Sequence, residues 1–250
     1  MTRSLWPREH GAYGQLLVPM AAALASGQPG PAALGLAIAA TAAFLAHEPA
    51  LVLAGRRGPR ARTDAGRRAR CRLTALLGLV AIGALGATHS SAVAAAAGAA
   101  ALLGMLVVLL ARHHVEKTLA GEVFVAAALA AAAGPVALAS GTRPLAAAWT
   151  WLAWSVGFAA VTCAVHGVSV RGGRRDGRAP RVAGATLAGG AIALAVVVGE
   201  PFAACVPLAV AAIVLAAVAP SPRRLRQIGW GLMAATLASG GWVVAAGYTL

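Results

Sequence analysis

The stretch that decides the fold is SAVAAAAGAAALLGMLVVLLA, residues 91–111. It contains no charged residue, and Arg112 follows it directly. A membrane-spanning helix needs about 20 consecutive, mostly apolar residues, because the hydrocarbon core of a bilayer is about 30 Å thick. This stretch therefore has the length and the composition of a transmembrane helix.

The rest of the chain repeats this pattern. The 250 residues are 60% hydrophobic and only 11% charged, whereas soluble domains carry about 25% charged residues. The sequence predicts an all-α polytopic membrane protein that forms a single domain over residues 1–250. We expect about nine transmembrane helices, in the apolar segments 11–27, 31–54, 73–87, 91–111, 118–140, 144–170, 182–199, 201–219 and 228–248.

The basic residues predict the orientation of these segments. The net charge is +14, and every Lys and Arg except Arg143 lies in the N-terminal tail or in every second connection. Cytoplasmic loops of membrane proteins carry an excess of Lys and Arg. We therefore expect a cytoplasmic N-terminus and an outside C-terminus, with anionic lipid as a partner of the basic loops. This placement, without any nucleic-acid-binding motif, argues against nucleic acid as a partner.

Two local features predict irregularities. Residues 56–72, RRGPRARTDAGRRARCR, contain eight arginines and are expected to form a long loop. Prolines within apolar segments predict kinks, because proline removes a helical hydrogen bond. Pro49 should also push the preceding Glu48 away from helical geometry. The four prolines concerned are Pro19, Pro49, Pro135 and Pro207.

Four ionisable residues lie inside the apolar segments, in the cytoplasmic third of the expected bundle: His47, Glu48, Glu122 and His166. A charge at the centre of a membrane helix costs about 2.5–3.5 kcal/mol and by default indicates function. We expect these side chains to line a cytoplasm-facing cavity, as catalytic groups, proton carriers or metal ligands. The alternative is that each is a packing group, hydrogen-bonded to a neighbouring helix. No HExxH-like spacing supports a metal site.

The N-terminal stretch REHGAYGQLLVP, residues 8–19, belongs to the same end of the bundle. Glu9 and His10 are expected at the rim or wall of the cavity. Arg8 is expected to anchor the interface or contact an anion. Tyr13 and Gln15 lie within a turn or two of them.

The stretch REHGAYGQLLVP, followed by LAHEPALVLAGRRG, resembles the YwiC-like family of bacterial membrane proteins. The resemblance is close over the first quarter of the chain, and the later segments fit the family in outline. It implies a multi-pass protein of the bacterial cytoplasmic (inner) membrane. It does not imply a particular activity.

A more distant resemblance is to the UbiA superfamily of intramembrane prenyltransferases, carried by VHGVSVRGGRRDGRAP and RHHVEKTLAGEVFVAAALAAAAGP. It implies a UbiA-like bundle, a prenyl diphosphate substrate and Mg²⁺ as cofactor. It also implies that Lys117, Arg171, Arg174 and Arg175 hold phosphate, near Asp176. The family's aspartate-rich pairs are missing, since only Asp64 and Asp176 stand in the two matching loops.

Three functions remain open from the sequence. The first is a UbiA-like transferase, or a binder of an anionic prenyl or lipid phosphate, in the cytoplasm-facing cavity. The second is a proton-coupled transporter that uses the same His and Glu residues, for which Thr150 and Ser155 are among the few polar groups toward the outer face. The third is a non-catalytic assembly partner of a membrane complex.

Overall fold

The computed structural model describes residues 5–7, 10–171, 177–200 and 202–247, without the side chains of His10 and Arg171. This part of the chain is all-helical and contains no strand. Its α-helices are α1 (His10–Ser26), α2 (Pro31–Leu53), α3 (Pro59–Ala84), α4 (Ser91–Arg112), α5 (Leu119–Ala131), α6 (Ala133–Ala139), α7 (Pro144–Arg171), α8 (Arg178–Val198), α9 (Val206–Val218) and α10 (Leu225–Ala245). Three short 3₁₀ helices join them, η1 (Leu85–His89), η2 (Phe202–Cys205) and η3 (Pro222–Arg224).

Each predicted apolar segment contains a helix of the structure. Seven helical segments in the described part are long and apolar enough to cross a membrane. They involve α2, α3, α4, α5 with α6, α7, α8 and α10. Large apolar side chains are exposed on the outer helices, among them Ile82 of α3 and Met105 of α4. Such an exterior suits contact with lipid hydrocarbon, so the chain is a multi-pass integral membrane protein.

The arginine-rich stretch 56–72 is not a long loop, so that prediction is wrong. Helix α3 begins at Pro59, and the chain turns only over residues 54–58. Ala61, Ala65 and Ala69 recur every four residues and form a buried face. Arginine is itself a good helix former. The small alanine face therefore packs while the arginines stay exposed, and the helix continues beyond its apolar half.

The prolines act in two ways. Pro49 lies inside α2, where Glu48 keeps helical geometry, so the predicted displacement of Glu48 is wrong. Pro19 likewise lies inside the continuous α1. Pro135 stands in the first turn of α6, just after the helix breaks at Ala132. Pro207 stands in the first turn of α9, after η2. The predicted breaks in the helices are thus present at Pro135 and Pro207.

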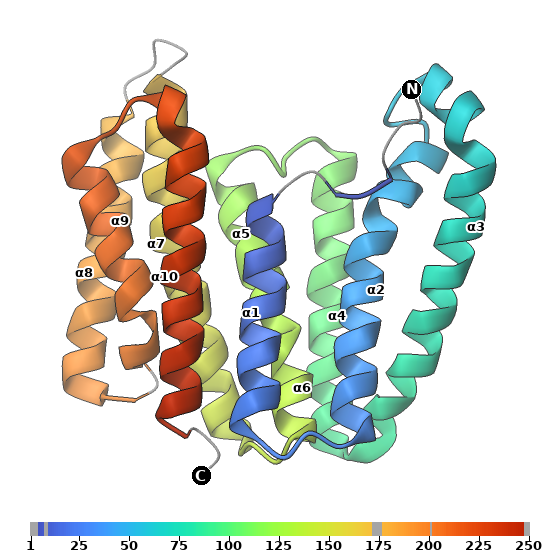
Figure 1. Ribbon diagram of the computed structural model, residues 1–250, viewed down its shortest axis with the longest axis horizontal. Helices are drawn as coiled ribbons and strands as arrows, with labels where there is room; N and C mark the ends of the chain where they lie inside the picture. Colours follow the sequence, from blue (N-terminus) through green and yellow to red (C-terminus); the bar gives the residue numbers. More distant parts are fainter. Residues whose placement is uncertain (1–4, 8–9, 172–176, 201, 248–250) are drawn as a thin grey trace.

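The bundle has two halves with α1 between them (Figure 1). One hydrophobic core joins α7, α8, α9 and α10, and includes Ala22 of α1. A second core joins α2, α4 and α6, and includes Leu16 and Met20 of α1. Helix α1 contacts α10 on one side, and α2, α5 and α6 on the other. Helix α5 also packs against α7, and its Ala126 and Ala130 belong to the first core, so α1 and α5 together join the halves.

The two ends of the bundle differ in charge. The start of α1, the end of α7, and the connections α2–α3, α4–α5 and α9–α10 lie at the upper end in Figure 1. The connection that contains Arg143, between α6 and α7, lies at the lower end. We call these the arginine-rich end and the Arg143 end. The charge segregation in the sequence is therefore a property of the folded molecule.

Candidate functional site

The start of α1 packs beside the second helix at the arginine-rich end. The ring of Tyr13 meets Phe44 of α2 edge to face, with the ring centroids 5.0 Å apart. The Tyr13 hydroxyl donates a hydrogen bond to the carbonyl oxygen of Pro7 at 3.3 Å. Phe44 lies about one turn before His47 and Glu48. Tyr13 of the N-terminal motif therefore packs on α2 about one turn from His47 and Glu48.

Much of the N-terminal motif lies outside the described residues. This holds for Arg8 and Glu9, and for the side chain of His10, whereas Gln15 is half-buried on α1. Before them, Leu5 is buried against Val52, Ala65 and Ala69. Trp6 lies beneath the Arg72 guanidinium, 4.2 Å from the ring centroid to Cζ. Residues 5–7 therefore connect α1 to the α2–α3 hairpin.

Glu48 is buried and ion-paired. Its side chain is only 3% exposed, and both of its oxygens are bound by Arg57. Arg57 Nε donates to Oε1 at 3.0 Å, and Nη2 donates to Oε2 at 2.6 Å. This two-pronged geometry is the strong form of a charge-assisted hydrogen bond. The pair closes the turn between α2 and α3, while the adjacent His47 is half-buried.

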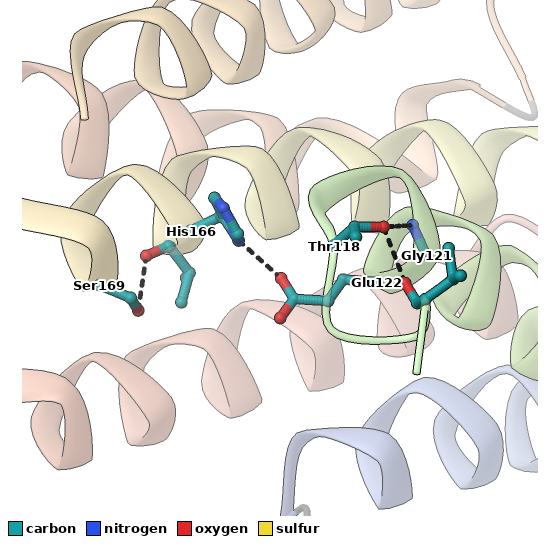
Figure 2. A network of polar contacts seen from close by, with 7 residues as sticks. Thr118, Gly121, Glu122, His166 and Ser169 are labelled. Atoms are coloured by element: carbon teal, nitrogen blue, oxygen red, sulfur yellow. Dashed lines mark hydrogen bonds and ion pairs between the residues drawn. The ribbon is translucent and has the colours of Figure 1, made fainter. Parts of the chain in front are cut away.

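Glu122 and His166 form a second pair, between α5 and α7 (Figure 2). His166 Nδ1 lies 3.0 Å from Glu122 Oε2. The side chain of Glu122 is 38% exposed and that of His166 is 21% exposed. Unlike Glu48, this pair can be reached by a solute at the arginine-rich end.

The start of α5 fixes the position of Glu122. Thr118 is the N-cap, and its Oγ1 accepts a hydrogen bond from the Gly121 N–H at 3.1 Å. The same hydroxyl donates to the Val115 carbonyl at 2.7 Å (Figure 2). A side chain at Gly121 would collide with that carbonyl, so glycine is required there. Glu122 follows in the first turn, where a negative charge is favoured by the helix dipole.

The sequence reasoning missed a contact between two connections. Arg56 Nη1 lies 2.8 Å from His114 Nε2, and Nη2 donates to the carbonyl oxygen of Arg112. His114 has a φ of +59°, in the left-handed position that ends α4. The Val115 N–H then bonds the Leu110 carbonyl at 3.0 Å. No sequence pattern within either connection predicts this contact, because it depends on how the two connections meet in the folded molecule.

The four predicted residues therefore lie at two separate places: His47 and Glu48 on α2, and Glu122 with His166 between α5 and α7. Glu48 belongs to the α2–α3 hairpin, and Glu122 with His166 belongs to α5 and α7. Within the described residues, no group of three or more His, Cys, Asp or Glu could hold a metal ion. Lys117 is exposed in the α4–α5 connection. Arg174, Arg175, Asp176 and the Arg171 side chain lie outside the described residues.

Two hollows lie elsewhere in the molecule. One, of about 30 Å³, lies between α1, α6, α7 and α10 toward the Arg143 end. The other, of about 460 Å³, lies between α2 and α3 with η1, near His89. Neither is lined by His47, Glu48, Glu122 or His166.

The apolar helical bundle with two differently charged ends defines an integral membrane protein. The family model described as YwiC-like protein matches residues 6–138, more than half of the chain. The protein therefore belongs to the YwiC-like family. The match covers α1 to α6, whereas α7 to α10 lie beyond it. No curated protein and no solved structure matches the chain, so the resemblance to the UbiA superfamily gains no support there.

Proposed function

We propose that this YwiC-like protein binds an anionic amphiphile, such as a prenyl or lipid phosphate, at its arginine-rich end. The proposal includes nine membrane crossings, a bacterial cytoplasmic membrane location and an arginine-rich end that faces the cytoplasm. It is supported chiefly by one observation. The first half of α3 exposes arginines, and the second half of the same helix exposes large apolar side chains such as Leu77 and Ile82.

The shape of α3 suits a ligand with a charged head and an apolar tail. Arg60, Arg67 and Arg68 are exposed on its first half. They lie seven and eight residues apart, which places them on neighbouring parts of one helix face. Each basic residue near an anionic surface contributes about 1 kcal/mol. A phosphate at these arginines would leave the tail beside the apolar half.

The Glu122–His166 pair is a separate polar feature of the same end, between α5 and α7 and away from α3. The pair is partly exposed, and histidine and carboxylate side chains are common proton-transfer groups. Glu48 has another role in this proposal, because Arg57 occupies both of its oxygens. Glu48 therefore shapes the arginine-rich end and does not touch the ligand.

Magnesium-dependent prenyl transfer is not part of the proposal. Two Mg²⁺ ions that bridge a diphosphate need several carboxylate ligands. The described residues provide no cluster of that kind. The donor set that the structure describes thus does not fit the cofactor implied by the UbiA resemblance.

The test compares farnesyl phosphate with farnesol, which has the same tail without the charge. Both are titrated against the purified protein in detergent at low and high salt. We expect farnesyl phosphate to bind more tightly, with a preference that falls as salt screens the arginines. Replacing Arg60, Arg67 and Arg68 together by Gln should weaken farnesyl phosphate binding more than tenfold, since each arginine contributes about 1 kcal/mol.

The matched control is Arg143→Gln, which removes an arginine from the opposite end. It should leave both affinities unchanged. Equal affinity for farnesyl phosphate and farnesol would refute the proposal. So would a triple variant that binds farnesyl phosphate as the wild type does.

Transport remains a second candidate because of one structural feature. Thr150 lines the smaller hollow, and the Ser155 hydroxyl is buried one turn further along α7. A proton-coupled transporter needs polar groups on the side opposite Glu122 and His166. This hollow supplies some of them.

A further inference from the structure

The smaller hollow lies where the two halves of the bundle meet around α1. Its wall includes Pro19, Ser26, Gly134, Thr142, Thr150 and Trp151. Its volume is about 30 Å³, above the roughly 10–15 Å³ that a single water molecule requires. Its wall is mostly apolar, but Ser26, Thr142 and Thr150 among the lining residues carry hydroxyl groups that can hold a water.

The hollow adjoins a break in the helical backbone. Helix α5 ends at Ala131, α6 begins at Ala133, and Ala133 and Gly134 line the hollow. At the break, the Ala132 N–H bonds the Leu129 carbonyl at 3.3 Å, which is a tighter turn than the α-helical one. Pro135 has no N–H, so the carbonyl of Ala131 lacks its helical donor. Pro19 removes a donor from α1 in the same way.

The polar side chains at the hollow donate hydrogen bonds to helix carbonyls, but these bonds do not use all of the hydrogen-bonding capacity there. Trp151 Nε1 donates to the Ala127 carbonyl at 3.1 Å. Ser26 donates to the Ala22 carbonyl, and Thr150 to the Ala146 carbonyl, each at 2.8 Å. Each hydroxyl oxygen can still accept hydrogen bonds. Irregular backbone at membrane depth is tolerated only where protein buries it or where it lines a water-filled cavity.

We propose that this hollow is a water site that hydrates the α5–α6 break from the Arg143 end. Thr142 lies beside Arg143 in the connection at that end, and Pro19 lies deeper in the bundle. From Ser26 to Pro19 the hollow follows α1 for seven residues, about 10 Å. The lining therefore extends from the Arg143 end toward the interior of the bundle.

Two buried hydroxyls lie just beyond the hollow. Ser155 follows the lining residue Trp154, and Ser239 lies one turn before the lining residue Val243. Within the described part of the chain, neither Oγ has a hydrogen-bond partner. Neither side chain lines the hollow, but each belongs to a helix that does. The inference is independent of lipid-phosphate binding, which concerns the opposite end.

The test is hydroxyl-radical footprinting of the full-length protein in lipid nanodiscs, since radicals formed from bound water oxidise the side chains beside it. Trp151 and Trp154 both line the hollow. Trp151 is also exposed on the outside of the bundle, so the buried Trp154 is the decisive reporter. We expect Trp154 to oxidise faster, relative to its intrinsic reactivity, than the equally buried Phe158. Phe158 stacks on Trp154 at a centroid distance of 5.4 Å but lies outside the hollow.

Gly134→Leu should fill the hollow, because a Cβ added there meets no atom within 4 Å. We expect it to lower the oxidation of Trp154 at least threefold. Gly98→Leu, at an exposed and equally open position on α4, is the matched control and should leave that rate unchanged. Thr150→Val, which keeps the shape but removes a hydroxyl, should produce a smaller decrease.

The proposal is overturned if Trp154 of the wild type is as protected as Phe158. It is also overturned if properly folded Gly134→Leu and Thr150→Val variants oxidise at wild-type rates. Thermal unfolding of each variant identifies any loss of fold, and Thr150→Val decides the matter if Gly134→Leu fails to fold.

Discussion

At the scale of single residues, the carboxylate of Glu48 illustrates how a charge is accommodated inside a membrane helix. Its side chain is 3% exposed, yet Arg57 reaches it from the turn nine residues later. Burial of a charge is expensive unless the charge is paired and hydrogen-bonded. Removal of the partner should therefore cost more than the net contribution of the pair itself.

We predict that Arg57→Met lowers the free energy of unfolding by about 2 kcal/mol, since hydrogen bonds to charged groups contribute about 1.5–3 kcal/mol. Methionine keeps an apolar stem but leaves the carboxylate without this partner. SDS-induced unfolding in mixed micelles would measure the change. Arg60→Met, at an exposed position of α3, is the control and should change stability little.

A double variant tests the cause. Glu48→Gln with Arg57→Met replaces the buried charge by a neutral amide, and should recover part of the lost stability. If Arg57→Met is no less stable than Arg60→Met, the pair does not hold the α2–α3 turn.

At the scale of elements, α2 and α3 pack through glycine. A Cβ at Gly83 would lie far inside van der Waals contact of the Gly35 carbonyl oxygen, and 2.8 Å from Cβ of Ala39. Backbone cannot move aside as a flexible side chain can, so α3 would shift away from α2. Small residues that allow such approach are typical of membrane helix contacts.

We predict that Gly83→Ala lowers the free energy of unfolding by about 1–3 kcal/mol, the usual cost of overpacking. Gly78→Ala is the matched control on the same helix, because a Cβ there meets no atom within 4 Å. It should be neutral, or stabilising by up to about 1 kcal/mol, since alanine is the better helix former. Equal effects of the two substitutions would contradict the packing role of Gly83.

The same helix shows which elements the sequence could predict. The apolar half of α3 was found by its length and composition, which reflect the thickness of the bilayer. The half that begins at Pro59 was not, because its packing face consists of the small residues Ala61, Ala65 and Ala69 among charged neighbours. Their four-residue spacing is a helical signal, but a mean-hydropathy criterion does not detect it.

At the scale of the whole molecule, the sequence predicted at which end of the bundle a residue lies. It did not predict which helices lie side by side. The sequence predicted one end for Glu48, Glu122 and His166. The helix ends that carry them, the end of α2, the start of α5 and the end of α7, lie at the same end of the bundle (Figure 1). The sequence could not show that Glu48 would pair with Arg57, while Glu122 and His166 pair across α5 and α7. Which helices become neighbours depends on packing through α1, and single-sequence periodicity does not contain that information.

The orientation of the whole bundle can be tested by chemical labelling of a natural cysteine. Cys71 is exposed at the arginine-rich end, whereas Cys163 and Cys205 are buried. A membrane-impermeant maleimide should therefore label the wild-type protein only at Cys71. If the arginine-rich end is cytoplasmic, as the distribution of basic residues predicts, labelling will occur in inside-out vesicles and not in intact cells.

Cys71→Ser should abolish this labelling, which confirms the target. Arg143→Cys in the Cys71→Ser background carries the only added thiol at the opposite end, and should be labelled in intact cells. Together the two cysteines fix both faces of the bundle with one reagent. Labelling of Cys71 in intact cells would reverse the orientation and would place the proposed lipid-phosphate site outside the cell. Labelling of both positions from one side would contradict the transmembrane arrangement itself.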